Sequence, residues 1–203
     1  MNTERTIPPA EIGLRANYKF IRADQWDIAR AVQERADKTF WTVREAYESL
    51  QEKGEAVKIW LEILKQGIPG FARVSEAHNL VPALLRNSLA TLISGTTVAP
   101  TFKANYLALG DGETSPASGD TTLENETLRS DFDDRSAEEN TAYLNVFFPA
   151  VDVGGNTYEE AGIFVDGTGS ADTGYLLSRV LLEVSLAAAE TLTINASITV
   201  NAA

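Results

Sequence analysis

The stretch Glu190-Thr-Leu-Thr-Ile-Asn-Ala-Ser-Ile-Thr-Val200 decides how the second half of this chain folds. Apolar residues stand at every second position from Leu192 to Val200, and Thr, Asn or Ser fills the positions between them. Because the side chains of a β-strand alternate between the two faces of a sheet, this spacing predicts a strand with one dry face and one polar face.

Further strands are expected upstream of this stretch, because strand patterns recur from residue 104 onward. Short acidic loops rich in Gly, Asp and Thr join them, with no pattern of a crossover helix between them. This arrangement favours antiparallel pairing in a β-sandwich that is jelly-roll-like or partly closed into a barrel. The expected strands cover 104–109, 142–153, 158–165, 175–186 and 191–200, and the pattern at 123–129 suits either a strand or a short helix.

The preceding half of the chain carries a helical pattern instead. Over residues 23–66 the apolar residues follow steps of three and four, with Asp24 as an N-cap and Gly67 as a stop. Gly54 interrupts this apolar stripe at a cost of about 1 kcal/mol relative to Ala, so it either weakens one helix or divides two. A second helix is expected from residue 80 or 82 to residue 93.

The apolar stripe has two interpretations. It can pack a helical hairpin against its own domain, as short helices usually gain their stability from tertiary contacts. It can also form a stem between identical chains, because its spacing is close to that of a coiled-coil seam. In the second interpretation the candidate interface residues are Val43, Tyr47, Leu50, Val57, Leu61 and Leu64.

Together these patterns predict an α+β protein in which an N-terminal helical region precedes an antiparallel β-sandwich. Residues 1–22 contain Pro8-Pro9 and show no clear period, so we expect an extended N-terminal arm. Residues 23–95 are expected to form a helical docking or oligomerisation region, and residues 96–203 an acidic β-sandwich.

The net charge of −12 is unevenly distributed along the chain. Residues 1–103 hold 14 Lys and Arg against 12 Asp and Glu, whereas residues 104–203 hold 3 Arg, no Lys and 17 Asp and Glu. An acidic surface repels phosphate backbones, so we expect no nucleic-acid binding. No stretch approaches the roughly 20 apolar residues of a membrane span, so we expect no membrane insertion.

Catalytic chemistry has few candidate groups in this sequence. Cysteine is absent, which excludes thiol nucleophiles and thiolate zinc sites, and the only histidine is His78, in a polar segment. The segment Gly110-Asp-Gly-Glu-Thr-Ser lacks both the third glycine of a dinucleotide fingerprint and the lysine of a phosphate loop. We therefore expect no enzymatic activity, no catalytic residue and no cofactor.

Acidic residues in two segments are candidate loop contacts with a partner: Asp111, Glu113, Asp120, Asp131 and Asp133. Such carboxylates could also hold a hard cation, but calcium needs about six to eight oxygens around one point. Neither segment has the ligand spacing of a helix–loop–helix calcium site. Solvated acidic loops are the favoured interpretation, we expect no metal site, and cation binding stays an open alternative.

A run of motifs lies between residues 79 and 200. The motifs are Asn79-Leu80 with Arg86-Asn-Ser-Leu89, Tyr106-Leu-Ala-Leu-Gly-Asp-Gly-Glu-Thr-Ser-Pro-Ala-Ser-Gly-Asp-Thr-Thr-Leu123, Glu126 with Arg129, Glu160-Ala-Gly-Ile-Phe164, Leu176-Leu-Ser-Arg179 and Glu190-Thr-Leu-Thr-Ile194. In their order they resemble structural proteins of tailed bacteriophages and prophages, usually described as tail-fibre, baseplate or minor virion proteins. One departure is Asp111, which stands where these proteins have a small residue.

This resemblance implies a virion structural protein of the tail-fibre or baseplate type, assembled in the host cytoplasm and acting by assembly and attachment. The implied partners are sister chains in a homotrimer, other virion proteins and a host surface receptor. A head decoration or collar protein is one alternative. A host-receptor or glycan-binding module, contacting its target through the acidic loops, is the other. The motifs are turns and strands, so they specify a scaffold better than a task.

Overall fold

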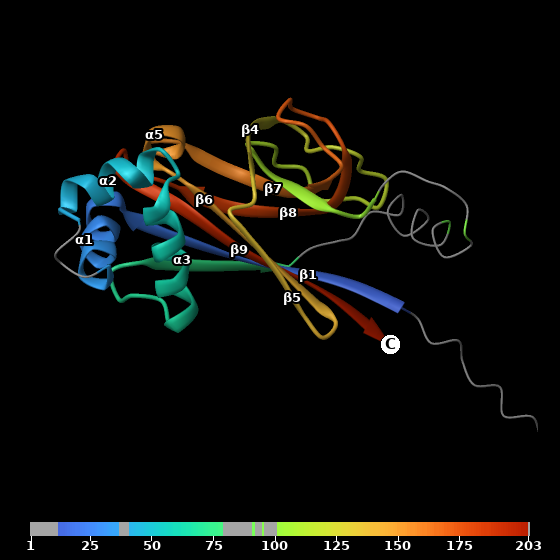
Figure 1. The fold of residues 1–203 in the computed structure, drawn as a ribbon. Helices are drawn as coiled ribbons and strands as arrows, with labels where there is room; N and C mark the ends of the chain where they lie inside the picture. The colour runs from blue at the N-terminus through green and yellow to red at the C-terminus, as the bar shows by residue number, and fades with distance from the viewer. Residues whose placement is uncertain (1–11, 37–40, 79–90, 92–94, 96–100, 203) are drawn as a thin grey trace, which may run out of the picture.

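Two antiparallel β-sheets pack face to face and form the body of the protein (Figure 1). The computed structural model describes residues 12–36, 41–78, 91, 95 and 101–202. Its strands are β1 (Ile12–Asp24), β2 (Arg73–His78), β3 (Ala104–Gly110), β4 (Glu126–Asp131), β5 (Asp134–Glu138), β6 (Thr141–Phe148), β7 (Thr157–Val165), β8 (Tyr175–Ser185) and β9 (Glu190–Ala202). Sheet A has the order β2-β1-β9-β6-β5, and sheet B the order β4-β3-β7-β8.

The C-terminal strand β9 lies at the centre of sheet A. It pairs along its whole length with β1 and on its other side with β6. Its apolar side chains from Leu192 to Ile198 point between the sheets, where they are buried with apolar residues of β1, β3, β6, β7 and β8. Fully burying one such side chain stabilises a fold by about 1.5–3 kcal/mol. The dry face that the alternation predicts is therefore one wall of the main core.

Three helices cover one end of the outer face of sheet A (Figure 1). They are α1 (Gln25–Arg35), α2 (Val43–Gln51) and α3 (Glu55–Gln66), and a short helix α5 (Ala150–Val153) follows β6. Ile21 of β1 and Phe147 of β6 point outward and pack with the apolar stripe of the helices. The fully buried Trp60 donates a hydrogen bond from Nε1 to Thr193 Oγ1 of β9, at 2.9 Å. This second core joins the helices to the sheet.

The helix ends follow the signals in the sequence. The Asp24 side chain caps α1 by accepting a hydrogen bond from the Trp26 backbone N–H at 2.8 Å, which confirms the expected N-cap. Gly54 stands at the N-cap of α3, so it separates α2 from α3. Gly67 ends α3, as expected.

The expected α+β class, with an N-terminal helical region, is wrong: the protein is mainly β, helices α1, α2 and α3 lie between strands β1 and β2 of one sheet, and α5 lies between β6 and β7. The physical reason is the alternation of Leu14, Ala16, Tyr18 and Phe20 with polar residues, which makes residues 12–24 a strand that β9 can pair. Residues 12–22, expected as part of an arm, lie within β1.

The later expected strands are present as β3, β7, β8 and β9. The ambiguous segment 123–129 enters strand β4 at Glu126, and the segment 142–153 breaks at Pro149 into β6 and α5. The expected second helix falls on residues outside the described ranges, apart from Thr91. Among the described helices, none is long and apolar enough to cross a membrane.

Candidate functional site

A loop formed by residues 111–122 folds over the outer face of sheet B. Leu123, at its end, is buried against Ala108, Phe164 and Leu176 of the sheet. Most of the loop is polar, so this apolar contact is small. A set of buried charges, described next, holds the rest of the loop in place.

Arg179 of β8 is the centre of this anchor, and its side chain is only 4% exposed. Its Nε lies 2.8 Å from Glu160 Oε2 on the neighbouring strand β7, and its Nη1 lies 2.9 Å from Asp120 Oδ2 in the loop. Its Nη2 donates to the Thr114 carbonyl at 3.0 Å. Burial alone would lower the pKa of Arg179, but its hydrogen bonds to Asp120 and Glu160 raise it. We call these four residues the loop clamp.

Glu160 also fixes the far end of the loop. Its carboxylate, which is fully buried, accepts hydrogen bonds from the backbone N–H groups of Glu124 at 3.1 Å and Asn125 at 2.8 Å. A Cβ atom at Gly110 or Gly112 would come within 2.6 Å of Glu160 Oε1. Glycine is therefore required at both positions because the backbone must approach this carboxylate closely.

Glu124 adds a hydrogen-bonded turn to the clamp. Its carboxylate accepts from the Thr114 backbone N–H at 2.8 Å and from the Thr114 hydroxyl at 2.7 Å. The Thr114 backbone N–H, followed by the hydroxyl, holds the pKa of Glu124 below its ordinary value. The ionised form of Glu124 thus helps to keep the loop closed.

A second buried pair holds the loop that precedes β8. Arg129 and Glu126, both in β4, form a two-point ion pair in which Nη2 lies 2.6 Å from Oε2. Arg129 also donates to the carbonyls of Thr168 at 2.9 Å and Thr173 at 3.2 Å, and its guanidinium lies 4.8 Å from the centroid of the Phe164 ring. The glutamates and arginines of the motif run thus pair within one chain.

The acidic residues predicted as loop contacts lie in different environments. Asp111 and Glu113 are exposed in the 111–122 loop, and Asp120 is bound to Arg179 in the loop clamp. Asp131 is exposed at the end of β4, and Asp133 is partly buried beside the helices. Among the described residues no group of three or more acidic or histidine side chains is placed to hold a metal ion. Contact of these residues with a partner stays a prediction.

Asp133 links the sandwich to the helices. It lies 3.0 Å from Lys53 Nζ, at the end of α2, and accepts a hydrogen bond from the Phe147 backbone N–H at 2.7 Å. Burial raises the pKa of Asp133, although Lys53 and the Phe147 N–H oppose this shift. This carboxylate has a structural partner on each side.

The predicted interface residues contribute to the second core. Leu50, Val57, Leu61 and Leu64 are buried against the helices and sheet A, whereas Val43 and Tyr47 are partly buried at its edge. The stripe is thus filled within one chain, and its role between chains stays a prediction. Tyr47 stacks on the exposed Trp26, with ring centroids 4.1 Å apart.

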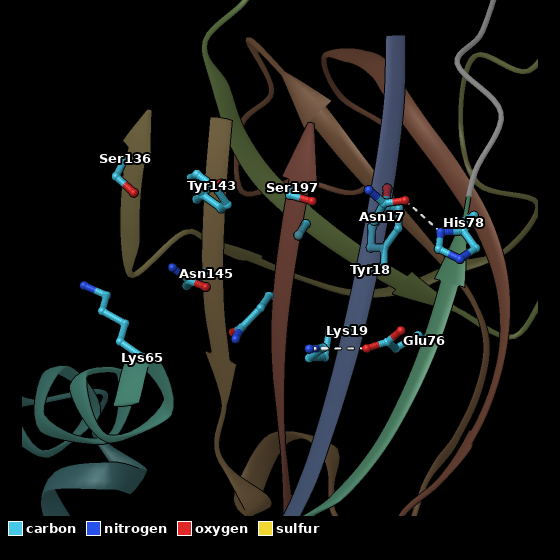
Figure 2. Close-up of a pocket in the computed structure, with 12 residues that line it drawn as sticks. Asn17, Tyr18, Lys19, Lys65, Glu76, His78, Ser136, Tyr143, Asn145 and Ser197 are labelled. Atoms are coloured by element: carbon cyan, nitrogen blue, oxygen red, sulfur yellow. Dashed lines mark hydrogen bonds and ion pairs between the residues drawn. The ribbon is translucent and has the colours of Figure 1, made fainter. Parts of the chain in front are cut away.

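A groove of about 610 Å³ lies on the outer face of sheet A, beside the helices (Figure 2). We call it the sheet A groove. Polar side chains from the five strands of sheet A, among them Ser136 of β5, and from the end of α3 line it, and sequence analysis did not identify it. Its lining includes Asn17 and Lys19 of β1, Glu76 and His78 of β2, Tyr143 and Asn145 of β6, Asn195 and Ser197 of β9, and Lys65 of α3.

The strand register brings these residues together. Asn17 lies opposite His78 and Lys19 opposite Glu76 across the β1–β2 pair, and both pairs interact (Figure 2). His78 Nδ1 is 2.7 Å from Asn17 Oδ1, and Lys19 Nζ is 3.2 Å from Glu76 Oε1. Asn195, on β9, lies opposite Lys19, and its Oδ1 is buried with no hydrogen-bond partner in the part of the chain that the structure describes. A signal was present in the sequence, because Asn195 and Ser197 stand on the polar face of the strand pattern.

Comparison of the chain with family models, with curated proteins and with solved structures finds no match. The geometry must therefore be interpreted from its own residues. The expectations of no enzymatic activity, no cofactor and no nucleic-acid partner stay predictions. The loop clamp can hold a loop rigidly on a sheet, and the sheet A groove can present hydrogen-bonding groups to a ligand.

Proposed function

We propose that this chain is a structural protein of a tailed-bacteriophage virion, of the tail-fibre or baseplate type, and that it acts by assembly and attachment. The proposal takes its family from the motifs of residues 79–200. The observation that supports it most is the loop clamp, because residues of separate motifs converge there. Glu160 and Arg179 come from two motifs and pair with each other, and the backbone at Gly110 and Gly112, in a third motif, closely approaches the Glu160 carboxylate.

This convergence gives the motifs a physical role in a scaffold. Arg–carboxylate pairs are directional, and removing one partner from a buried pair is costly, so the clamp holds its loop in one conformation. A building block that is used in many copies needs surfaces of fixed shape, since each interface repeats the same geometry. An acidic surface on the sandwich also keeps crowded copies from associating non-specifically.

The decisive experiment locates the chain on particles. Virions are purified by density gradient from a lysate of cells that carry the gene, and mass spectrometry compares the amount of this chain with that of the major capsid protein. Immunogold electron microscopy with antibody against the recombinant chain then shows its position. We expect label at the tail tip or baseplate.

Other outcomes of this experiment separate the alternatives. Label along the capsid or at the neck would favour a head decoration or collar protein over a tail component. Absence of the chain from purified particles, with the antibody still detecting it in the lysate, would sink the virion proposal altogether.

The oligomeric state is tested on the recombinant protein. We expect sedimentation equilibrium to give a mass of three 22.0 kDa chains for a homotrimer. A 22.0 kDa species at all concentrations, with circular dichroism showing intact structure, would contradict the expected self-association.

A further inference from the structure

We infer that the sheet A groove is a binding site for a neutral oligosaccharide. This inference does not rest on the virion proposal, because it concerns only residues that line the groove. It rests on three properties of these residues: their charges are paired, their amides can bind hydroxyl groups, and one aromatic ring is exposed among them.

The charged side chains of the groove neutralise one another. Lys19 pairs with Glu76 at 3.2 Å, and Lys65 lies 2.8 Å from Glu62 and 3.2 Å from Asp134. An anionic ligand would have to compete with these carboxylates for the two lysines. A neutral ligand can instead add hydrogen bonds around the ion pairs without disturbing them.

Three of the hydrogen-bonding side chains of the groove are amides. Asn17, Asn145 and Asn195 come from three adjacent strands, and Asn145 lies directly opposite Asn195. An amide presents an acceptor and two donors in one plane, so it can bind two neighbouring hydroxyl groups of a sugar at once. The repeat of amides across the strands suits a ligand with many hydroxyl groups.

Among these amides, Asn195 gives the most specific indication of a ligand. Its Oδ1 is buried and has no hydrogen-bond partner among the described residues. Buried polar atoms are nearly always paired, and an unpaired acceptor lowers stability, so such an atom needs an explanation. A hydroxyl group of a bound sugar would supply the missing donor once the Asn195 side chain turns this covered oxygen toward the groove.

Tyr143 provides an apolar surface beside the amides. Its side chain points outward from β6 and is 40% exposed, next to Asn145 and Ser197 in the groove (Figure 2). The face of an aromatic ring can pack on the C–H face of a pyranose ring, while the Tyr hydroxyl stays in contact with water. The groove volume of about 610 Å³ lies in the range of roughly 300–1,000 Å³ that small-molecule sites occupy.

The test uses the intact chain and a panel of neutral hexasaccharides: cellohexaose, maltohexaose, isomaltohexaose, mannohexaose and chitohexaose. Saturation-transfer NMR at millimolar sugar identifies a ligand, and isothermal titration then measures its affinity. We expect at least one of these sugars to bind. Saturation transfer to none of them would overturn the inference, and so would binding of a hyaluronan hexasaccharide alone, because that sugar is charged.

Variants assign the binding to the groove. Asn195→Leu removes the unpaired acceptor, and Tyr143→Ala removes the ring; each should weaken binding by about tenfold or more, as expected for the loss of one good contact. Asn156→Leu, outside the groove, serves as the matched control and should bind as the original chain does. Melting curves followed by circular dichroism check that each variant is folded.

Two results with these variants would contradict the inference. Unchanged sugar affinity in both groove variants would place the binding elsewhere on the chain. The second result has two parts: the original chain binds no sugar, and Tyr143→Ala no longer self-associates in sedimentation. This combination would make the groove an interface between copies of the chain. Neither result depends on whether the chain is found in virions.

Discussion

The two sheets of this protein are covered on their outer faces in different ways. Sheet A is covered at one end by three helices whose apolar stripe packs around Trp60. Sheet B is covered by a polar loop that the Glu160–Arg179 pair holds in place, with only Leu123 as a substantial apolar contact. The first cover resembles a second hydrophobic core, and the second depends on a few directional charges.

The difference shows how a helix and a loop can each be held on the outer face of a sheet. An amphipathic helix has a continuous apolar face to bury, so many weak contacts add up without demanding one geometry. A Gly- and Asp-rich loop has no such face, and it needs partners at defined positions to stay in one conformation. We therefore expect the two covers to fail in different ways, and the following predictions test this from the largest effect to the smallest.

Trp60→Ala should have the largest effect on stability. It removes the largest side chain of the second core, so we expect the free energy of unfolding to fall by about 3–5 kcal/mol, measured by urea denaturation. Val151→Ala is the control, because Val151 is 67% exposed and should change the free energy by less than about 0.5 kcal/mol. A loss below about 1 kcal/mol in Trp60→Ala would contradict the assignment of a cooperative core beneath the helices.

Arg179→Met should come next, with a loss of about 3 kcal/mol, because it leaves the buried Glu160 carboxylate without its charged partner. The double variant Arg179→Met with Glu160→Gln removes the stranded charge and retains an acceptor for one of the two backbone N–H groups of Glu124 and Asn125. It should therefore be more stable than the single variant. If both have the same stability, stranded charge is not the cause of the loss.

A smaller loss of stability is expected from a substitution in β9, and it should depend on whether the helices cover the position. Thr193→Val leaves the Trp60 Nε1–H buried without its acceptor and should cost about 1–3 kcal/mol. Ser197→Ala changes the same face of β9 in the open groove and should cost less than about 0.5 kcal/mol. Equal losses, measured by thermal unfolding, would mean that the helices do not distinguish the two positions.

The smallest effect is a pH dependence of the loop that covers sheet B. The Thr114 hydrogen bonds lower the folded-state pKa of Glu124, so its stabilisation is complete above the ordinary carboxyl pKa of about 4.5 and is lost as pH falls through the lower folded-state value. The stability difference between the original chain and Glu124→Gln should therefore be largest at pH 7 and shrink below pH 4.5. Urea unfolding between pH 7 and pH 3 measures it.

The control for this pH series is Glu183→Gln, which changes an exposed carboxylate on β8 away from the loop. Its stability difference from the original chain should vary much less with pH. A difference for Glu124→Gln that stays constant from pH 7 to pH 3 would rule out a contribution of the ionised carboxylate.

Local patterns predicted many elements of this fold. The alternation at Thr191–Val200 gave β9, Asp24 marked the start of α1, and Gly54 marked a break between helices. The first strand was missed although its residues from Leu14 to Phe20 alternate with polar residues, because the alternation ends at Ile21, which lies under the helices. Near its end the strand is dry on both faces, since Phe20 lies in the main core.

The candidate sites, like the fold, were predictable from the sequence only in part. The motif residues Glu160 and Arg179 were visible in the sequence, and the structure pairs them across neighbouring strands. The contacts of Arg179 with Thr114 and Asp120 were not visible, because side-chain direction across a folded loop depends on tertiary contacts. Apart from the polar face of β9, the sheet A groove gave no motif, since its residues are spread along the chain from Asn17 to Ser197.

The sequence by itself determined that β3, β7, β8 and β9 become strands, that a helical pattern lies between Asp24 and Gly67, and that one face of β9 is dry, because these follow from the spacing of apolar residues along the chain. Only the tertiary structure decided that β1 and β9 lie side by side and that the helices cover just one end of sheet A. The polar face of β9 shows why: Thr193 is buried beneath Trp60, whereas Ser197 lines the sheet A groove. The alternation places Thr193 and Ser197 on the same face of β9, and the packing of distant segments decides that one is covered and the other open.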